Sequence, residues 1–164
     1  MDFAQWLTEN PAGELFYTFL IAMLPVVELR GAIPVGVGML GRSALPSVYL
    51  AAVLGNMLPV PFIIVYIRRI FQWLRRRSRR LDGLVTRLET KAHLKGRMVT
   101  RYKYLGLCIL VAIPLPGTGA WTGALVAAFL DMRLRSAVPA IFLGVVIAGI
   151  LVSLVTGGVI AAFF

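Results

Sequence analysis

The stretch Ile113-Pro114-Leu115-Pro116-Gly117-Thr118-Gly119 lies in the middle of an apolar run that extends from about residue 104 to residue 130. Two prolines and two glycines within six residues oppose a continuous helix, because proline removes a backbone donor and glycine lowers helix propensity. Broken backbone at membrane depth is tolerated only where protein buries it or a cavity surrounds it. The run therefore predicts a re-entrant hairpin, which consists of a half-helix, a turn and a second half-helix.

Three further apolar runs cover about residues 15–40, 44–67 and 136–164. The first also carries helix-breaking or charged residues near its middle and predicts a second re-entrant hairpin: Pro25, Glu28, Arg30, Gly31, Pro34, Gly36 and Gly38. The other two runs predict transmembrane helices, because each has about the 20 apolar residues that a span needs. Hydrophobic residues make up 59% of the 164 residues, above the ~45–50% of an ordinary soluble domain. The fold class that we expect is an all-α integral membrane protein with a single membrane domain.

The two halves of the chain share a short motif. Arg42-Ser43-Ala44-Leu45-Pro46 leads into the second run, and Arg135-Ser136-Ala137-Val138-Pro139 leads into the fourth. A match at the same point of two similar halves indicates an internal repeat. We expect residues 15–68 and residues 104–164 each to form a hairpin followed by a span, with residues 69–103 as the linker.

The distribution of charge predicts the topology. Of the 17 Lys and Arg residues, 13 lie between Arg68 and Lys103, which places this linker in the cytoplasm. The first 14 residues are acidic and contain no Lys or Arg, which argues against a cleavable signal peptide and places the N-terminus outside. The expected location is the plasma (inner) membrane, with several passes and the second repeat inverted relative to the first. A rival topology has four full spans and an internal N-terminus.

The net charge of +10 can indicate nucleic acid binding, but apolar flanks favour anionic lipid headgroups as the partner of the linker. Leu81, Leu84 and Leu88 recur on one helical face of the linker and basic residues occupy the other face. This pattern predicts an amphipathic helix on the cytoplasmic leaflet. It can act as a topology anchor alone, or it can collect anionic lipid or gate the second hairpin.

Glu28 and Arg30 are charged residues in the apolar first run. A charge at bilayer depth is costly and usually marks a partner, a cavity or a proton path. The two side chains can form a neutral pair that only pins the hairpin turn. Alternatively, Arg30 binds the headgroup of an anionic substrate and Glu28 takes up and releases a coupled proton. A tight pair would favour the ionised carboxylate and oppose proton transfer.

The second hairpin carries candidate substrate contacts of another kind. Gly117 and Gly119 allow a tight turn and expose N–H groups at the start of a half-helix, where anions are attracted. Thr118 and Thr122 can add hydroxyl groups, and Trp121 can line a groove for a lipid tail. These residues can equally permit the turn, cap the half-helix and pack between the hairpins, without touching a substrate.

Asn56 lies inside the second run, where a lone Asn usually hydrogen-bonds a neighbouring helix or a freed carbonyl and can alternatively contact the substrate. The sequence shows no Ser-His-Asp arrangement, paired-carboxylate site, phosphate-binding loop or metal-ligand cluster, so we expect no enzyme, no cofactor and no metal. Four membrane elements form a small core, and we therefore expect a homodimer or a higher homo-oligomer.

Two motifs carry a family resemblance. The stretch Glu28-Leu29-Arg30-Gly31-Ala32-Ile33-Pro34 and the stretch that begins at Pro114 and reads Pro-Leu-Pro-Gly-Thr-Gly-Ala-Trp-Thr-Gly together resemble the family of small multidrug export proteins. The resemblance covers nearly the whole chain, and the family looks like a distant branch of the DedA/VTT superfamily. Members of that superfamily are associated with moving lipids across bilayers, including undecaprenyl phosphate, and with dependence on the proton gradient.

The resemblance implies a flippase or carrier that moves an anionic polyprenyl-phosphate-like lipid between leaflets. DedA proteins carry arginines in or beside the second motif, whereas the membrane arginine of this chain is Arg30 in the first motif. The second hairpin of this chain therefore lacks the arginines that bind phosphate in the resembled superfamily. Two other functions stay open, namely efflux of small molecules or ions and a scaffold that transports nothing.

Overall fold

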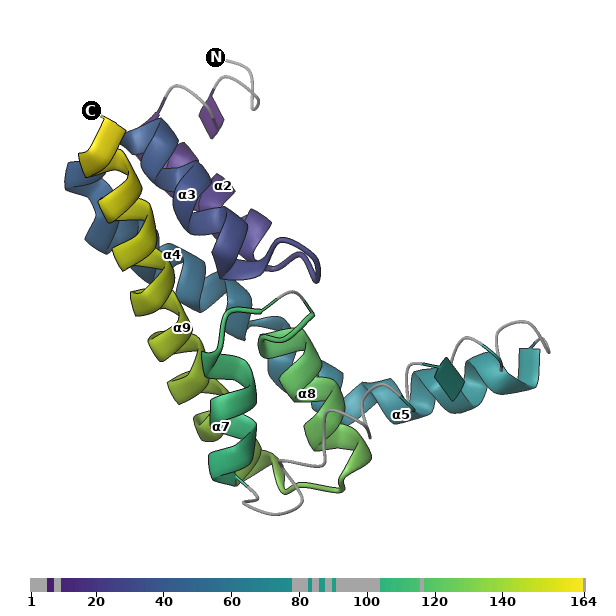
Figure 1. The fold of residues 1–164 in the computed structure, drawn as a ribbon. Coiled ribbons are helices and arrows are strands. Elements are labelled where there is room, and N and C mark those ends of the chain that lie inside the picture. The colour runs from purple at the N-terminus through teal and green to yellow at the C-terminus, as the bar shows by residue number, and fades with distance from the viewer. Residues whose placement is uncertain are drawn as a thin grey trace. The chain divides into compact units, whose positions relative to one another are not determined.

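The computed structural model describes residues 6–7, 10–77, 83, 86–87, 90, 104–115 and 117–163, and its regular elements are all helices (Figure 1). Contacts divide the chain into two units, one formed by Met1–Leu58 with Val145–Phe164 and the other by Pro59–Gly144. The all-helical fold that the sequence predicts is confirmed for the described residues. The predicted amphipathic helix of the linker lies almost entirely outside them.

Three antiparallel helices form the body of the first unit (Figure 1). They are α2 (Pro11–Ala22), α3 (Glu28–Leu40) and α4 (Leu45–Met57), with the short 3-10 helix η1 (Arg42–Ala44) between the last two. Asn10 caps α2, because its Oδ1 accepts a hydrogen bond of 3.0 Å from the N–H of Ala12. Gly41 ends α3 with a φ of 82°, a conformation that favours glycine.

Glycines set the distances between these three helices. A Cβ atom on Gly36 of α3 would lie 2.6 Å from Oγ1 of Thr18 in α2 and 2.8 Å from Cγ1 of Val48 in α4. A Cβ atom on Gly55 of α4 would collide with the carbonyl oxygen of Phe19 in α2. Each of the three helices therefore touches the other two at a point where only glycine fits.

The break in the first apolar run is shorter than its composition suggests. Only Met23–Val27, which includes Pro25, lies outside a helix, whereas Pro34, Gly36 and Gly38 lie inside α3. Pro34 removes one hydrogen bond from the helix, the one that would reach the carbonyl of Arg30. The apolar face of α3, with Leu29, Ala32, Ile33 and Val37 buried, outweighs that loss.

The second unit contains α5 (Pro59–Arg77), α7 (Tyr104–Ala112), α8 (Ala120–Phe129) and the first part of α9 (Leu134–Phe163). Helix α8 packs on α5 and on α7. Gly123 of α8 and Gly144 of α9 both approach Val111 of α7, so small residues again allow close packing. At the end of α8, Asp131 has a φ of 54°, and the N–H of Met132 bonds the carbonyl of Ala127, which closes a Schellman motif.

Two segments are long and apolar enough to cross a membrane, residues 42–67 and residues 134–159. The first of these contains a pause at Leu58, where α4 ends and α5 begins, because Pro59 and Pro61 have no N–H to donate. The helices α2, α3, α7 and α8 have 12, 13, 9 and 10 residues. At about 1.5 Å per residue, none of the four reaches across a hydrocarbon core of about 30 Å.

The two copies of the Arg-Ser-Ala-x-Pro motif adopt different local structures. The first forms η1 and the start of α4, with Pro46 in the first turn of that helix. The second lies wholly within α9, which has Pro139 in its interior. The inverted repeat stays a prediction.

Replacement of Gly55 by Ala is expected to destabilise the first unit by about 1–3 kcal/mol, because the added methyl meets main-chain atoms of α2 that cannot rotate away. The matched control is Gly38→Ala in α3, where nothing lies within 4 Å of the new Cβ atom. This control should be neutral or slightly stabilising, since Ala favours helix over Gly by about 1 kcal/mol. Thermal unfolding in detergent, followed by circular dichroism, measures both variants. Equal melting temperatures would contradict the proposed packing.

Candidate functional site

The turn between α2 and α3 presents a buried carboxylate. The N–H of Leu24 bonds the carbonyl of Ile21, and the N–H of Glu28 bonds the carbonyl of Leu24, so the turn is tightly wound. Glu28 then opens α3 with a φ of 49°, in the left-handed region that non-glycine residues seldom adopt. Such strained backbone costs on the order of 1–3 kcal/mol and clusters at functional sites.

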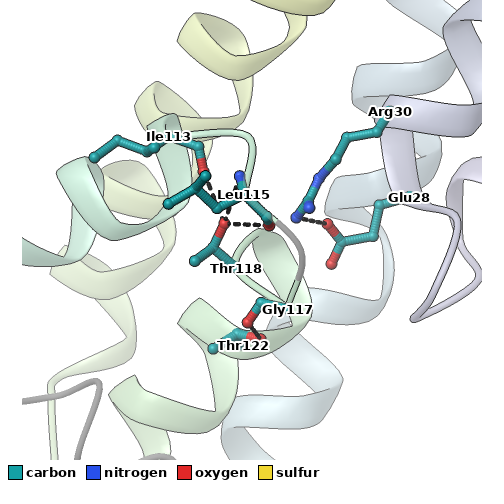
Figure 2. Close-up of polar contacts among 7 residues, drawn as sticks. All are labelled: Glu28, Arg30, Ile113, Leu115, Gly117, Thr118 and Thr122. Carbon is teal, nitrogen blue, oxygen red and sulfur yellow. Dashed lines mark hydrogen bonds and ion pairs between the residues drawn. The ribbon is translucent and has the colours of Figure 1, made fainter.

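Arg30 forms an ion pair with this carboxylate. Its Nη2 lies 3.3 Å from Oε2 of Glu28, and the two side chains are 25% and 5% exposed, respectively (Figure 2). A nearly buried carboxylate without a partner would be strongly unfavourable. Arg30 supplies the compensating charge and keeps a quarter of its own side chain accessible, so it can also meet a ligand. The pairing that the sequence left open is therefore observed.

The second turn, between α7 and α8, is organised by one hydroxyl group (Figure 2). Oγ1 of Thr118 lies 2.7 Å from the carbonyl oxygen of Ile113 and 2.8 Å from that of Leu115, to which it can donate. The same oxygen accepts a hydrogen bond of 3.1 Å from the N–H of Leu115. The proton of the Thr118 hydroxyl is thus used by the backbone of the turn.

The start of α8 follows directly from this turn. Gly117 and Gly119 have φ values of 76° and 128°, which only glycine adopts readily, and no side chain caps the helix at Gly119. Oγ1 of Thr122 donates to the carbonyl oxygen of Gly117 at 3.0 Å (Figure 2). Trp121 is half-buried beside these residues. The two threonines thus make the turn-stabilising contacts that one of the two sequence hypotheses proposed. Substrate binding at this turn stays a prediction.

Asn56 occupies the last turn of α4. It is completely buried, and neither Nδ2 nor Oδ1 has a hydrogen-bond partner among the described residues. Leaving such groups unpaired costs about 1–3 kcal/mol. A buried amide without a hydrogen-bond partner is a typical feature of a polar site that binds a further group.

The predicted site residues fall into two groups. Glu28, Arg30 and Asn56 belong to the first unit, whereas the residues from Gly117 to Thr122 belong to the second. The first group combines a strained, buried carboxylate, its guanidinium partner and an unpaired amide, and it is the candidate functional site. Within the described part of the chain, no three His, Cys, Asp or Glu side chains gather in a way that can hold a metal ion.

Tyr49 forms a contact with α9 that the sequence did not predict. Its hydroxyl donates a hydrogen bond of 3.1 Å to the carbonyl oxygen of Val146 in α9, and Gly149 leaves the space that the ring occupies. Beside it lies an apolar hollow of about 250 Å³, which is lined in part by Ser153 and Leu154. A tyrosine in an apolar run needs a hydrogen-bond partner, and that need was the available signal.

Two apolar segments that are long enough to cross a membrane, together with short apolar helix pairs, are typical of a helical membrane protein. Residues 28–151 match the family described as "Putative small multi-drug export protein", and the chain belongs to this family. The matched region includes Glu28, Arg30 and Asn56 as well as the second turn. A search of curated proteins and a search of solved structures found no match. The resemblance to the small multidrug export family is thereby confirmed, whereas the relation to the DedA/VTT superfamily stays a prediction.

Replacement of Thr118 by Val is expected to destabilise the second turn by about 0.5–1.5 kcal/mol, because the carbonyl oxygens of Ile113 and Leu115 lose the hydroxyl that donates to them. Thr118→Ser keeps the hydroxyl and should lose much less. Thermal unfolding in detergent compares the two variants with the wild type. If Thr118→Val is as stable as Thr118→Ser, the hydroxyl does not hold the turn.

Proposed function

We propose that the chain is a membrane transporter that moves an anionic lipid phosphate between leaflets, with Arg30 as the ligand of the phosphate and Glu28 as the carrier of a coupled proton. The observation that carries the proposal is the buried ion pair at the turn between α2 and α3. A strained backbone at Glu28 and the partial exposure of Arg30 support a role beyond pinning the turn. We propose no enzymatic step.

We propose that both helix pairs, α2 with α3 and α7 with α8, are re-entrant hairpins. The four helices are too short to cross a bilayer. The turn of each pair would therefore lie inside the hydrocarbon core, about halfway across it. Non-helical backbone there has to be buried in protein or line a cavity. Paired broken helices in inverted halves are typical of transporters, and the proposed topology has the N-terminus outside and the basic linker in the cytoplasm.

The substrate class follows from the chemistry of the first turn. A guanidinium presents a planar fork of N–H donors that fits a phosphate oxygen pair, and it keeps its charge at all accessible pH values. The second turn supports an anionic substrate independently, because α8 begins without a side-chain cap and its dipole favours negative charge. The resemblance to the DedA/VTT superfamily favours a polyprenyl phosphate among anionic lipids.

A second function is efflux of a small anionic molecule. The description of the family, which names multidrug export, favours it. The same residues would act, with Arg30 binding the anion and Glu28 the proton. In either case the working unit that we propose is a homodimer or larger assembly, because a membrane domain of this size forms only a small core.

Arg30→Gln is expected to slow transport of a fluorescent polyprenyl phosphate at least about tenfold, because a charge-assisted hydrogen bond to phosphate contributes roughly 1.5–3 kcal/mol. The assay uses the full chain in phosphatidylcholine vesicles and follows quenching of the probe by an impermeant reductant. Arg30→Lys should retain part of the activity, and Glu28→Gln should abolish the dependence of the rate on an imposed pH gradient.

The matched control is Arg42→Gln, an exposed arginine of the same unit, which should transport like the wild type. A fluorescent phosphatidylcholine serves as the zwitterionic control probe and should not move. Equal rates for Arg30→Gln and the wild type would overturn the proposed function. If the lipid probe is static while vesicles release an anionic dye in an Arg30-dependent manner, the efflux function is the correct one.

A further inference from the structure

The unpaired amide of Asn56 has a candidate partner that the register of α3 and α4 identifies. These two helices are consecutive, antiparallel and in contact. Gly36 and Val48 mark one point where they touch, since a Cβ atom at Gly36 would lie 2.8 Å from Cγ1 of Val48. Equal steps away from this point along both helices join residues that face each other.

One turn from the Gly36–Val48 contact, Ala32 faces Ala52, and both are completely buried, as the register requires. Two turns away, at about 12 Å along each helix, the same register places Glu28 at the level of Asn56. The two most buried polar side chains of this helix pair thus lie at the same level and on the same inner faces.

Contacts with α2 give the same result independently. A Cβ atom on Gly55, beside Asn56, would collide with the carbonyl oxygen of Phe19 and lie 3.1 Å from the Cβ atom of Ala22, the last residue of α2. The chain leaves α2 at this point and reaches Glu28 through the tight turn of residues 23–27. Glu28 and Asn56 are therefore both at the end of the unit where α2 ends.

We infer that Asn56 is the partner of Glu28 in its protonated state, whereas Arg30 is its partner in the ionised state. A carboxylate only accepts hydrogen bonds, but a carboxylic acid has one donor and one acceptor, which are the complement of the N–H and C=O of a side-chain amide. The amide of Asn56 can therefore form two hydrogen bonds with the protonated acid. This inference rests on the proposed function for the part that Arg30 plays.

The step conserves charge and atoms. A hydronium ion transfers one proton to a carboxylate oxygen of Glu28 and becomes water, the contact with Nη2 of Arg30 breaks, and the neutral acid turns to Asn56. The guanidinium stays charged and becomes available to the phosphate of the substrate. Release of the proton to water and return of Glu28 to Arg30 complete the cycle. Asn56 thereby stabilises the state in which Arg30 can bind the anion.

The other polar and charged groups around Glu28 are few in the described part of the unit. The turn before it consists of Met23, Leu24, Pro25, Val26 and Val27. On α2, the acidic residue Glu14 lies in the first turn, at the opposite end of the helix. On α4, Tyr49 donates to Val146, and Arg42 of η1 precedes the helix at its other end. Arg30 is thus the charged group whose contact with Glu28 the structure describes.

Infrared difference spectroscopy tests the inference on the full chain in phosphatidylcholine vesicles. Acid-minus-neutral spectra contain the C=O stretch of each protonated carboxyl, and Glu28→Gln identifies the band of Glu28 by its loss. Asn56→Leu should shift that band to higher wavenumber, as expected for an acid that loses its hydrogen bonds. Leu has the same number of side-chain heavy atoms and the same branching as Asn but no polar atoms, so this variant should fold. An unshifted band would overturn the inference.

A disulfide tests the register without reference to protonation. In a Cys108→Ala background, the pair Glu28→Cys and Asn56→Cys should cross-link on mild oxidation, because a disulfide requires Cα atoms about 4.4–6.8 Å apart and the register brings these two residues together. The control pair, Glu28→Cys with Leu54→Cys, should not cross-link, since Leu54 is 61% exposed on the outer face of α4. Cross-linking of the control pair alone would overturn the register.

The outcomes separate the inference from the proposed function. If the band of Glu28 shifts in Asn56→Leu but Arg30→Gln transports the lipid probe normally, the inference about Asn56 holds and the proposed function fails. If transport depends on Arg30 but the band does not shift, the proposed function holds and the inference fails. The same Asn56→Leu variant should also slow transport of the probe at least about threefold if both are correct.

Discussion

The ion pair of Glu28 and Arg30 sets the constraint that the rest of the first unit has to meet. A carboxylate that is 5% exposed requires a positive partner close by, and α3 has to begin at Glu28 for Arg30 to reach it from two residues further along. The backbone of Glu28 accepts a φ of 49° to make that start possible. The cost of the strained backbone at Glu28 is thus offset by neutralisation of its charge in an apolar turn.

Close packing at glycines determines what surrounds this pair. Gly36 and Gly55 bring α2, α3 and α4 together along their length and thereby fix the level at which each inner residue lies. The second unit uses Gly123 and Gly144 in the same way, and its turn depends on Thr118 rather than on a charge. The turns of the two short helix pairs are therefore stabilised by different interactions. An ion pair stabilises the first turn, and a hydroxyl group together with two glycines stabilises the second.

Much of this arrangement was visible in the sequence. The run from Pro114 to Gly119 predicts a turn because its residues cannot continue a helix, and the structure has that turn. The extent of the first break was not predictable, since Pro34 removes one hydrogen bond and burial of the rest of α3 compensates for it. The unpaired amide of Asn56 and its register with Glu28 depend on contacts between helices, and a single sequence does not encode those contacts in any local pattern.

The central claim is that α2 with α3 and α7 with α8 turn back inside the bilayer. Cysteine accessibility in intact cells tests it most directly, with single cysteines at Glu14, Arg42, Arg76 and Asp131 in a Cys108→Ala background. The account predicts that positions 14 and 42 react with an impermeant reagent from outside and that positions 76 and 131 react from the cytoplasm. Labelling of positions 14 and 42 from opposite sides would show that α2 and α3 do not turn back, and it would contradict the account.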